Sequence, residues 1–118
     1  SEPSNPMKKT ILSAISRSVG RYAISSISKV RLSRMDYSAL VDDAQIMSND
    51  KTLGFVEKVC GIRIVVDEYM PMGMIALHSG DDIIVCNLTD QSMFKFHKAL
   101  PLKIGGKTKE YVMDFMGK

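Results

Sequence analysis

The chain has 118 residues, of which 45% are hydrophobic and 25% are charged. This length fits one domain with a substantial core, because a chain of about this size buries roughly two-thirds of the surface that it exposes when unfolded. The sequence contains no apolar run of the ~18 or more residues that a membrane-spanning helix needs. We therefore expect no transmembrane helix and no membrane partner.

The charge of the chain is unevenly distributed. Residues 1–35 contain seven basic groups and one acid, which gives +6, whereas the other 83 residues contain nine basic and twelve acidic groups, which gives −3. Cations gathered in one segment are typical of contacts with nucleic acid phosphates. The candidate nucleic-acid contacts are Lys8, Lys9, Arg17, Arg21, Lys29, Arg31 and Arg34. Tyr22 is the only aromatic residue in the helix predicted for this segment, so a solvated or subunit-facing helix side is the alternative.

The N-terminal part predicts a long helix. Residues 1–5 are interpreted as a flexible arm or a remnant of expression, and 6–118 as a single domain. Asn5-Pro6 is typical of a helix start. Apolar residues then recur every three to four positions up to Val30, which predicts an amphipathic helix over about 6–32 or one that breaks near Gly20. The same Ser-rich stretch is also typical of a transit peptide, so a targeting signal is a second interpretation.

The middle of the chain predicts short elements separated by turns. We expect a short second element over residues 35–41, a short strand over 44–48, and a helix over 52–58 that Asp50 caps and Gly61 ends. Three apolar segments follow, bounded by Met70-Pro71-Met72-Gly73 and by Ser79-Gly80-Asp81-Asp82, both of which are typical of turns. The expected strands are residues 62–66, 74–78 and 83–88, the last being either a strand or the start of a helix.

The C-terminal part predicts one or two further strands. Apolar residues alternate from Phe94 to Ile104, Gly105-Gly106 is a turn signal, and residues 110–116 form a last strand or a helical turn. The expected fold class is therefore α+β, with a long N-terminal amphipathic helix followed by a small, mainly antiparallel sheet with short flanking helices.

Three patterns in the sequence suggest reaction chemistry. Gly106-Lys107-Thr108 suggests a phosphate-binding loop, but the glycine required five residues earlier is Pro101. The two cysteines, Cys60 and Cys86, form no Cys-x-x-Cys motif, and a disulfide between them is neither required nor excluded. Neither cysteine has a histidine placed beside it in the sequence as a base, the two candidates being His78 and His97.

Paired acids are the last chemical pattern. Asp67-Glu68 and Asp81-Asp82 stand at turns, and adjacent residues of an extended chain point to opposite faces, so neither pair converges by itself. Turn acids that bond nearby backbone are the simpler interpretation. We accordingly predict no catalytic residue, no metal site and no cofactor, and we expect the protein not to be an enzyme.

Residues 44–88 resemble a known family. AQIMSNDKTLGFVEKV followed by CGIRIVVDEYMPMGMIALHSGDDIIVC is similar to the strand–turn–strand pattern in major capsid proteins of tailed bacteriophages, the Johnson fold. The resemblance implies a viral capsid subunit, or a fragment of a larger one, that assembles with its own copies into a shell in the virion or in the host cytoplasm. It also implies a turn that contacts neighbouring subunits, formed by Tyr69, Met70, Pro71, Met72 and Gly73. The alternative function is a small nucleic-acid-binding regulator that uses the basic N-terminal helix.

Overall fold

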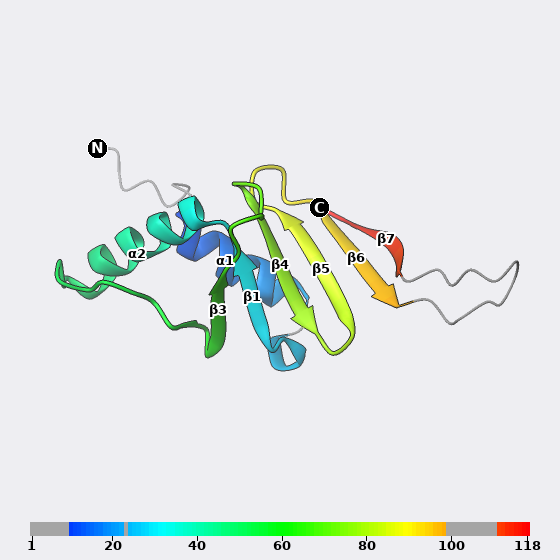
Figure 1. Ribbon diagram of the computed structural model, residues 1–118, viewed down its shortest axis with the longest axis horizontal. Helices are drawn as coiled ribbons and strands as arrows, with labels where there is room; N and C mark the ends of the chain where they lie inside the picture. The colour runs from blue at the N-terminus through cyan, green and yellow to red at the C-terminus, as the bar shows by residue number, and fades with distance from the viewer. Residues whose placement is uncertain (1–9, 23, 99–110) are drawn as a thin grey trace, which may run out of the picture.

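A computed structural model describes residues 10–22, 24–98 and 111–118 (Figure 1). It contains two helices and one sheet, which confirms the α+β class. The helices are α1 (Ile11–Arg21) and α2 (Arg34–Ser48), with a short 3-10 turn at Ile24–Ser26. The strands are β1 (Lys29–Leu32), β2 (Lys58–Val59), β3 (Ile62–Val66), β4 (Met74–Ser79), β5 (Asp82–Asn87), β6 (Met93–Lys98) and β7 (Tyr111–Gly117).

The strands form one seven-stranded sheet in the order β2-β3-β1-β4-β5-β6-β7. β1 and β3 are parallel, and the other described pairings are antiparallel, as the sequence predicts. The sheet is larger than expected, because the end of the predicted N-terminal helix, Lys29–Leu32, forms strand β1 instead. β1 enters between β3 and β4 and so places residues from the N-terminal part in the middle of the sheet.

The core lies between α1 and one face of the sheet (Figure 1). Along β1, β4 and β5 every second side chain points toward α1, because successive residues of a strand face opposite sides. These buried residues pack with Ile15 and Val19 of α1 and Leu40 of α2, and they include Val30, Leu32, Ile75, Leu77, Ile84 and Cys86. α2 extends beyond the sheet beside α1, and the face in front in Figure 1 carries no helix among the described residues.

The first helix is shorter than predicted. Thr10 caps it by accepting from the backbone N–H of Ser13, and the helix ends at Arg21, next to the Gly20 break that the sequence offered as an alternative. Residues 29–32 form a strand with alternating burial. The helix predicted for residues 27–32 was wrong because this segment fits two periods. Ile27 and Val30 fit a helical period, whereas Val30 and Leu32 fit a strand period. The expected helix start at 6–9 lies outside the described residues.

Two predictions for the middle of the chain were wrong. The strand expected over 44–48 is helical, because Arg34–Ser48 forms one helix. Ser33 caps this helix by accepting from the N–H of Asp36, and the left-handed Asn49 ends it. The helix expected over 52–58 is absent from this described segment. Residues 53–57 are neither helix nor strand, and β2 begins at Lys58. β2 and β3 form a hairpin whose two-residue turn is Cys60-Gly61, with φ of 54° and 78°. Two positive φ values in a two-residue loop match the twist of the adjoining strands.

The later strands are confirmed. β3, β4, β5 and β7 occur where the sequence places strands, and residues 83–87 and 111–117 are strands rather than helical turns. The alternation predicted over Phe94 to Ile104 holds through Lys98. The remainder of that segment, with Gly105-Gly106, lies outside the described residues.

Candidate functional site

The candidate site is the exposed segment Asp67–Gly73 between β3 and β4, which we call the contact turn. Tyr69 is 95% exposed and Met72 is 69% exposed, while Met70 is half-buried. The turn therefore presents one large aromatic side chain and one large apolar side chain to solvent. These are the residues that the sequence resemblance predicts as subunit contacts.

Residues from β1 and α2 hold the contact turn in place. Arg31 of β1 forms an ion pair with Asp67, and Arg34 at the start of α2 forms one with Glu68. The backbone N–H of Gly73 donates to Asp36 Oδ2 of α2 at 2.7 Å. Asp36 is 8% exposed, so this acceptor lies in the protein rather than in solvent. The turn is therefore tied to the fold at both ends.

Hydrogen bonds inside the contact turn add to this order. The N–H of Tyr69 donates to Asp67 Oδ1 at 2.9 Å, and the N–H of Met70 donates to the carbonyl of Asp67 at 3.1 Å. The bond from Tyr69, together with the Arg31 guanidinium, lowers the pKa of the Asp67 carboxyl. Arg34 likewise lowers the pKa of Glu68. The lowered pKa values keep both carboxyls ionised at more acidic pH than free carboxyls, which preserves the ion pairs that anchor the turn as the pH falls.

His78 is the second partner of Arg31. Arg31 Nε lies 2.8 Å from His78 Nε2, so the imidazole is neutral and accepts a hydrogen bond there. Burial lowers the pKa of His78, and the nearby charges of Arg31 and Lys29 lower it further. The chain Asp67–Arg31–His78 thus links the contact turn to the middle of the sheet.

We expect His78 to make stability depend on pH as the pH falls through and below its ordinary pKa of 6.5. Its folded-state pKa lies below the ordinary value of 6.5, so the unfolded chain binds more protons in this range and stability falls as the pH falls. His78→Gln keeps an acceptor for Arg31 but cannot titrate. Urea titrations at several pH values should show a flatter pH dependence in the variant. An unchanged dependence would contradict the role assigned to His78.

The basic residues predicted for nucleic acid do not lie on one helix. Lys8 and Lys9 lie outside the described residues. Arg17 and Arg21 are on α1, and Arg21 donates to the carbonyl of Gln91 at 2.7 Å. The remaining three belong to β1 or α2, namely Lys29, Arg31 and Arg34. The basic helix of the alternative function is therefore not formed as predicted, because part of its sequence is a central strand.

The structure does not bring a cysteine and a histidine together in the part of the chain that it describes. Cys86 is buried on the helix side of the sheet, whereas His78 bonds Arg31 on the other side. His97 Nε2 lies 2.9 Å from Asp114 Oδ2. No group of three or more metal-ligating side chains occurs among the described residues. The Gly-Lys-Thr sequence at 106–108 lies outside them.

The two thiols are both free and differ in accessibility. Cys60 is exposed at the β2–β3 hairpin, whereas burial raises the pKa of Cys86 to about 11. Because the thiolate is the reactive form, we expect one thiol per native chain to react with a disulfide reagent at about pH 8 and two after unfolding. The Cys60→Ser variant should show no native reaction. Rapid native labelling of that variant would contradict the burial of Cys86.

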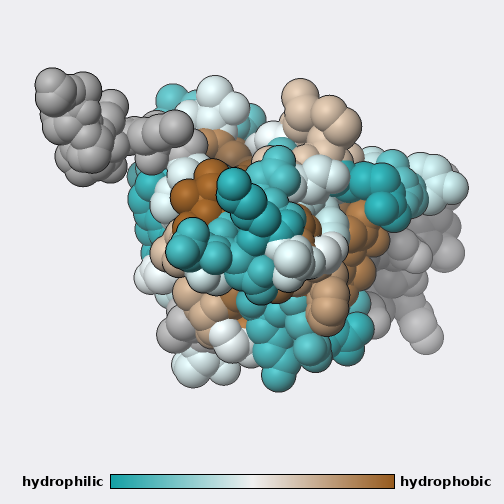
Figure 2. Space-filling model, turned by 90° about the vertical axis from the view of Figure 1, so that its left-hand side faces the viewer, coloured by the Kyte–Doolittle hydropathy of each residue, from teal (hydrophilic) through white to brown (hydrophobic). Residues whose placement is uncertain are grey.

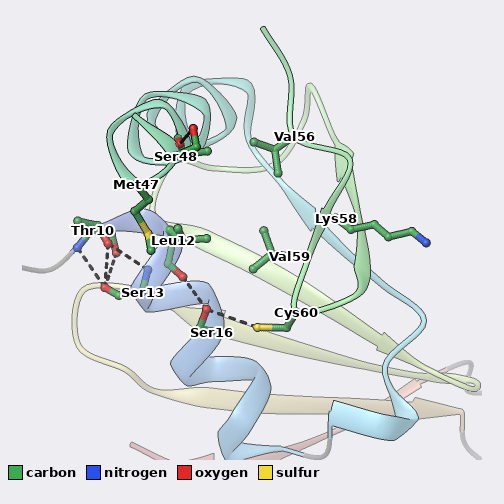
Figure 3. Close-up of a pocket in the computed structure, with 11 residues that line it drawn as sticks. Thr10, Leu12, Ser13, Ser16, Met47, Ser48, Val56, Lys58, Val59 and Cys60 are labelled. Atoms are coloured by element: carbon green, nitrogen blue, oxygen red, sulfur yellow. Dashed lines mark hydrogen bonds between the residues drawn. The ribbon is translucent and has the colours of Figure 1, made fainter. Parts of the chain in front are cut away.

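A groove of about 670 Å³ lies between α1, α2 and the β2 hairpin (Figure 3). Apolar side chains line much of it, including Leu12, Met47, Val56 and Val59. Its serines already have partners, because Ser16 Oγ donates to the carbonyl of Leu12 at 3.0 Å and Ser13 bonds Thr10. Lys58 points away from it (Figure 3). The groove therefore offers apolar surface without a free polar group that would select a ligand.

The sequence missed the residues that support the contact turn. Asp36 gives no local signal of its role, because its partner Gly73 lies 37 positions away.

Among the described residues, no helix is both long enough and apolar enough to cross a membrane. Comparison of the chain with protein-family models, with curated proteins and with solved structures finds no match.

Proposed function

We propose that this chain is a structural subunit, or a domain of one, that assembles with its own copies into a viral capsid-type shell. The observation that carries the proposal is the contact turn, in which a firmly anchored backbone displays Tyr69 and Met72 to solvent. A contact surface that is ordered before binding loses less conformational freedom when it binds. Such a turn suits repeated contacts between identical subunits.

A second apolar surface supports assembly in a head-to-tail manner. Ile46 and Met47 at the end of α2 are 79% and 74% exposed, and Phe55 in the following loop is 65% exposed. Figure 2 views the molecule from the α2 end and shows apolar patches among hydrophilic ones. Two different apolar surfaces on one subunit favour heterologous contacts, which close into rings or shells or continue as open arrays. The proposed location is the virion or the host cytoplasm.

Light scattering combined with negative-stain electron microscopy tests the proposal. We expect the scattered intensity per unit mass to rise with protein concentration, and the particles to be closed shells or curved arrays. Extra salt should not dissolve them, since the proposed contacts are mainly apolar and salt screens only charges. A chain that stays monomeric at its solubility limit would contradict the proposal.

A further inference from the structure

The helix-free face of the sheet, which we call the open face, has an ordered arrangement of side chains. The strand registers place one residue from each strand in a single row across the sheet. Neighbouring strands are about 4.8 Å apart, so the row is about 30 Å long. In sheet order it consists of Lys58, Arg63, Lys29, His78, Ile83, Phe96 and Met113.

One end of this row is cationic. Lys58 and Arg63 are exposed and Lys29 is half-buried, and none of the three forms an ion pair within the described ranges. Arg31 lies one step further along β1 on the same face, where Asp67 neutralises it. Strand alternation places Asp82 on the helix side, since its neighbours Ile84 and Cys86 are core residues. The cationic end thus has uncompensated positive charge.

The other end of the open face is aromatic. Phe94 and Phe96 of β6 point to it, and Phe115 of β7 is paired with Phe94, with ring centroids 5.1 Å apart. Phe115 is 60% exposed and the other two rings are half-buried. Three strand spacings separate Lys29 from Phe96, which is about 14 Å. Flat aromatic rings and unpaired cations therefore lie on the same face of the sheet, and the distance between them is on the scale of nucleotides.

We propose that the open face binds single-stranded nucleic acid. Lys58, Arg63 and Lys29 would contact phosphates, while bases stack on the phenylalanines of β6 and β7. Aromatic side chains beside a basic track form the usual surface for unpaired strands, because every base has a stacking face. A duplex hides those faces, so the rings favour single strands. This function is separate from shell assembly, which uses the contact turn.

Fluorescence anisotropy with a labelled oligo(dT) of about 20 nucleotides tests the proposal on the full chain. We expect binding at about 50 mM salt that weakens as salt rises. Lys29→Gln combined with Arg63→Gln should weaken binding about tenfold or more at about 100 mM salt and reduce the salt slope by about 1.4. Phe96→Leu, which retains an apolar side chain, should weaken binding about fivefold without changing the slope.

Controls distinguish the open face from general positive charge. Arg17→Gln combined with Lys51→Gln removes the same charge from α1 and the loop after α2, and we expect less than a twofold change. Circular dichroism confirms that each variant is folded. Tyr69→Ser combined with Met72→Ser should bind the oligonucleotide normally, since these residues lie outside the open face.

Several results would overturn the proposal. One is the absence of binding by the wild-type chain at about 50 mM salt, where phosphate contacts are strongest. A second is an equal loss in the control pair, which would assign binding to α1 or to net charge. A third is equal affinity for duplex DNA with no effect of Phe96→Leu. The fourth is binding to anionic lipid vesicles but not to oligo(dT), which would make the open face a lipid surface.

Discussion

Replacing Leu77 with alanine is expected to lower the free energy of unfolding by about 2–5 kcal/mol. Leu77 is fully buried on β4, the central strand of the sheet, and its side chain faces α1. The substitution removes apolar atoms from a packed cluster and leaves a cavity that the strands on either side cannot close. Urea unfolding followed by circular dichroism measures the change.

Ile83→Ala is the matched control for Leu77. It removes the same number of carbon atoms from the neighbouring strand, but Ile83 is on the open face and half-buried. We expect its cost to be less than half of that for Leu77→Ala. Equal costs would show that both faces of the sheet are packed, and would contradict the assignment of a single core between α1 and the sheet.

Replacing Tyr69 and Met72 together with serine is expected to abolish self-association while leaving the chain folded. Both side chains are largely exposed, so their removal costs little packing energy in the isolated subunit. The ion pairs of Asp67 and Glu68 and the bond from Gly73 to Asp36 remain, so the backbone of the turn should keep its shape. Sedimentation velocity should show monomers at concentrations where the wild-type chain assembles.

Met116→Ser provides the comparison for this variant. Met116 is 41% exposed on β7, the edge strand farthest from β3 in the sheet order. We expect assembly by Met116→Ser to match that of the wild type. If the serine pair at the contact turn assembles normally, the turn is not the subunit contact, and the exposed apolar residues at the end of α2 become the better candidates.

The sequence predicts the second half of this fold well. β3, β4 and β5 consist of β-branched and other apolar residues between turns that contain Gly61, Gly73 and Gly80. Gly80 has a φ of 59°, which suits a glycine at a hairpin turn. Local turn chemistry and residue type determine these elements, so a short window of sequence is sufficient.

The first half is less predictable because tertiary contacts decide it. The segment Lys29–Leu32 becomes a strand only because β3 and β4 pair with it on both sides. α2 also gave a weak signal, since its exposed Met35 and Ile46 obscure the amphipathic pattern. Pairings across 34 to 49 positions, such as Lys29 with Arg63 and with His78, cannot be inferred from local spacing.

The candidate sites, like the fold, can be predicted from the sequence only in part. The composition of the contact turn was visible in Tyr69-Met70-Pro71-Met72-Gly73, but its anchors on β1 and α2 were not. The cationic row on the open face joins Lys58, Arg63 and Lys29 from three separate elements. Sequence patterning instead assigned Lys29 to a basic helix, because the strand register that aligns these residues exists only in the folded sheet.

Photo-crosslinking from position 69 tests the central claim most directly. A chain with p-benzoylphenylalanine in place of Tyr69 keeps a large aromatic side chain at the tip of the contact turn. After assembly and irradiation, we expect covalent dimers and larger species on a denaturing gel, with mass spectrometry placing the link between residue 69 of one copy and a defined surface of another. The same substitution at position 116 should give little crosslinking. Crosslinking from position 116 but none from position 69 would contradict the claim that the contact turn joins the subunits.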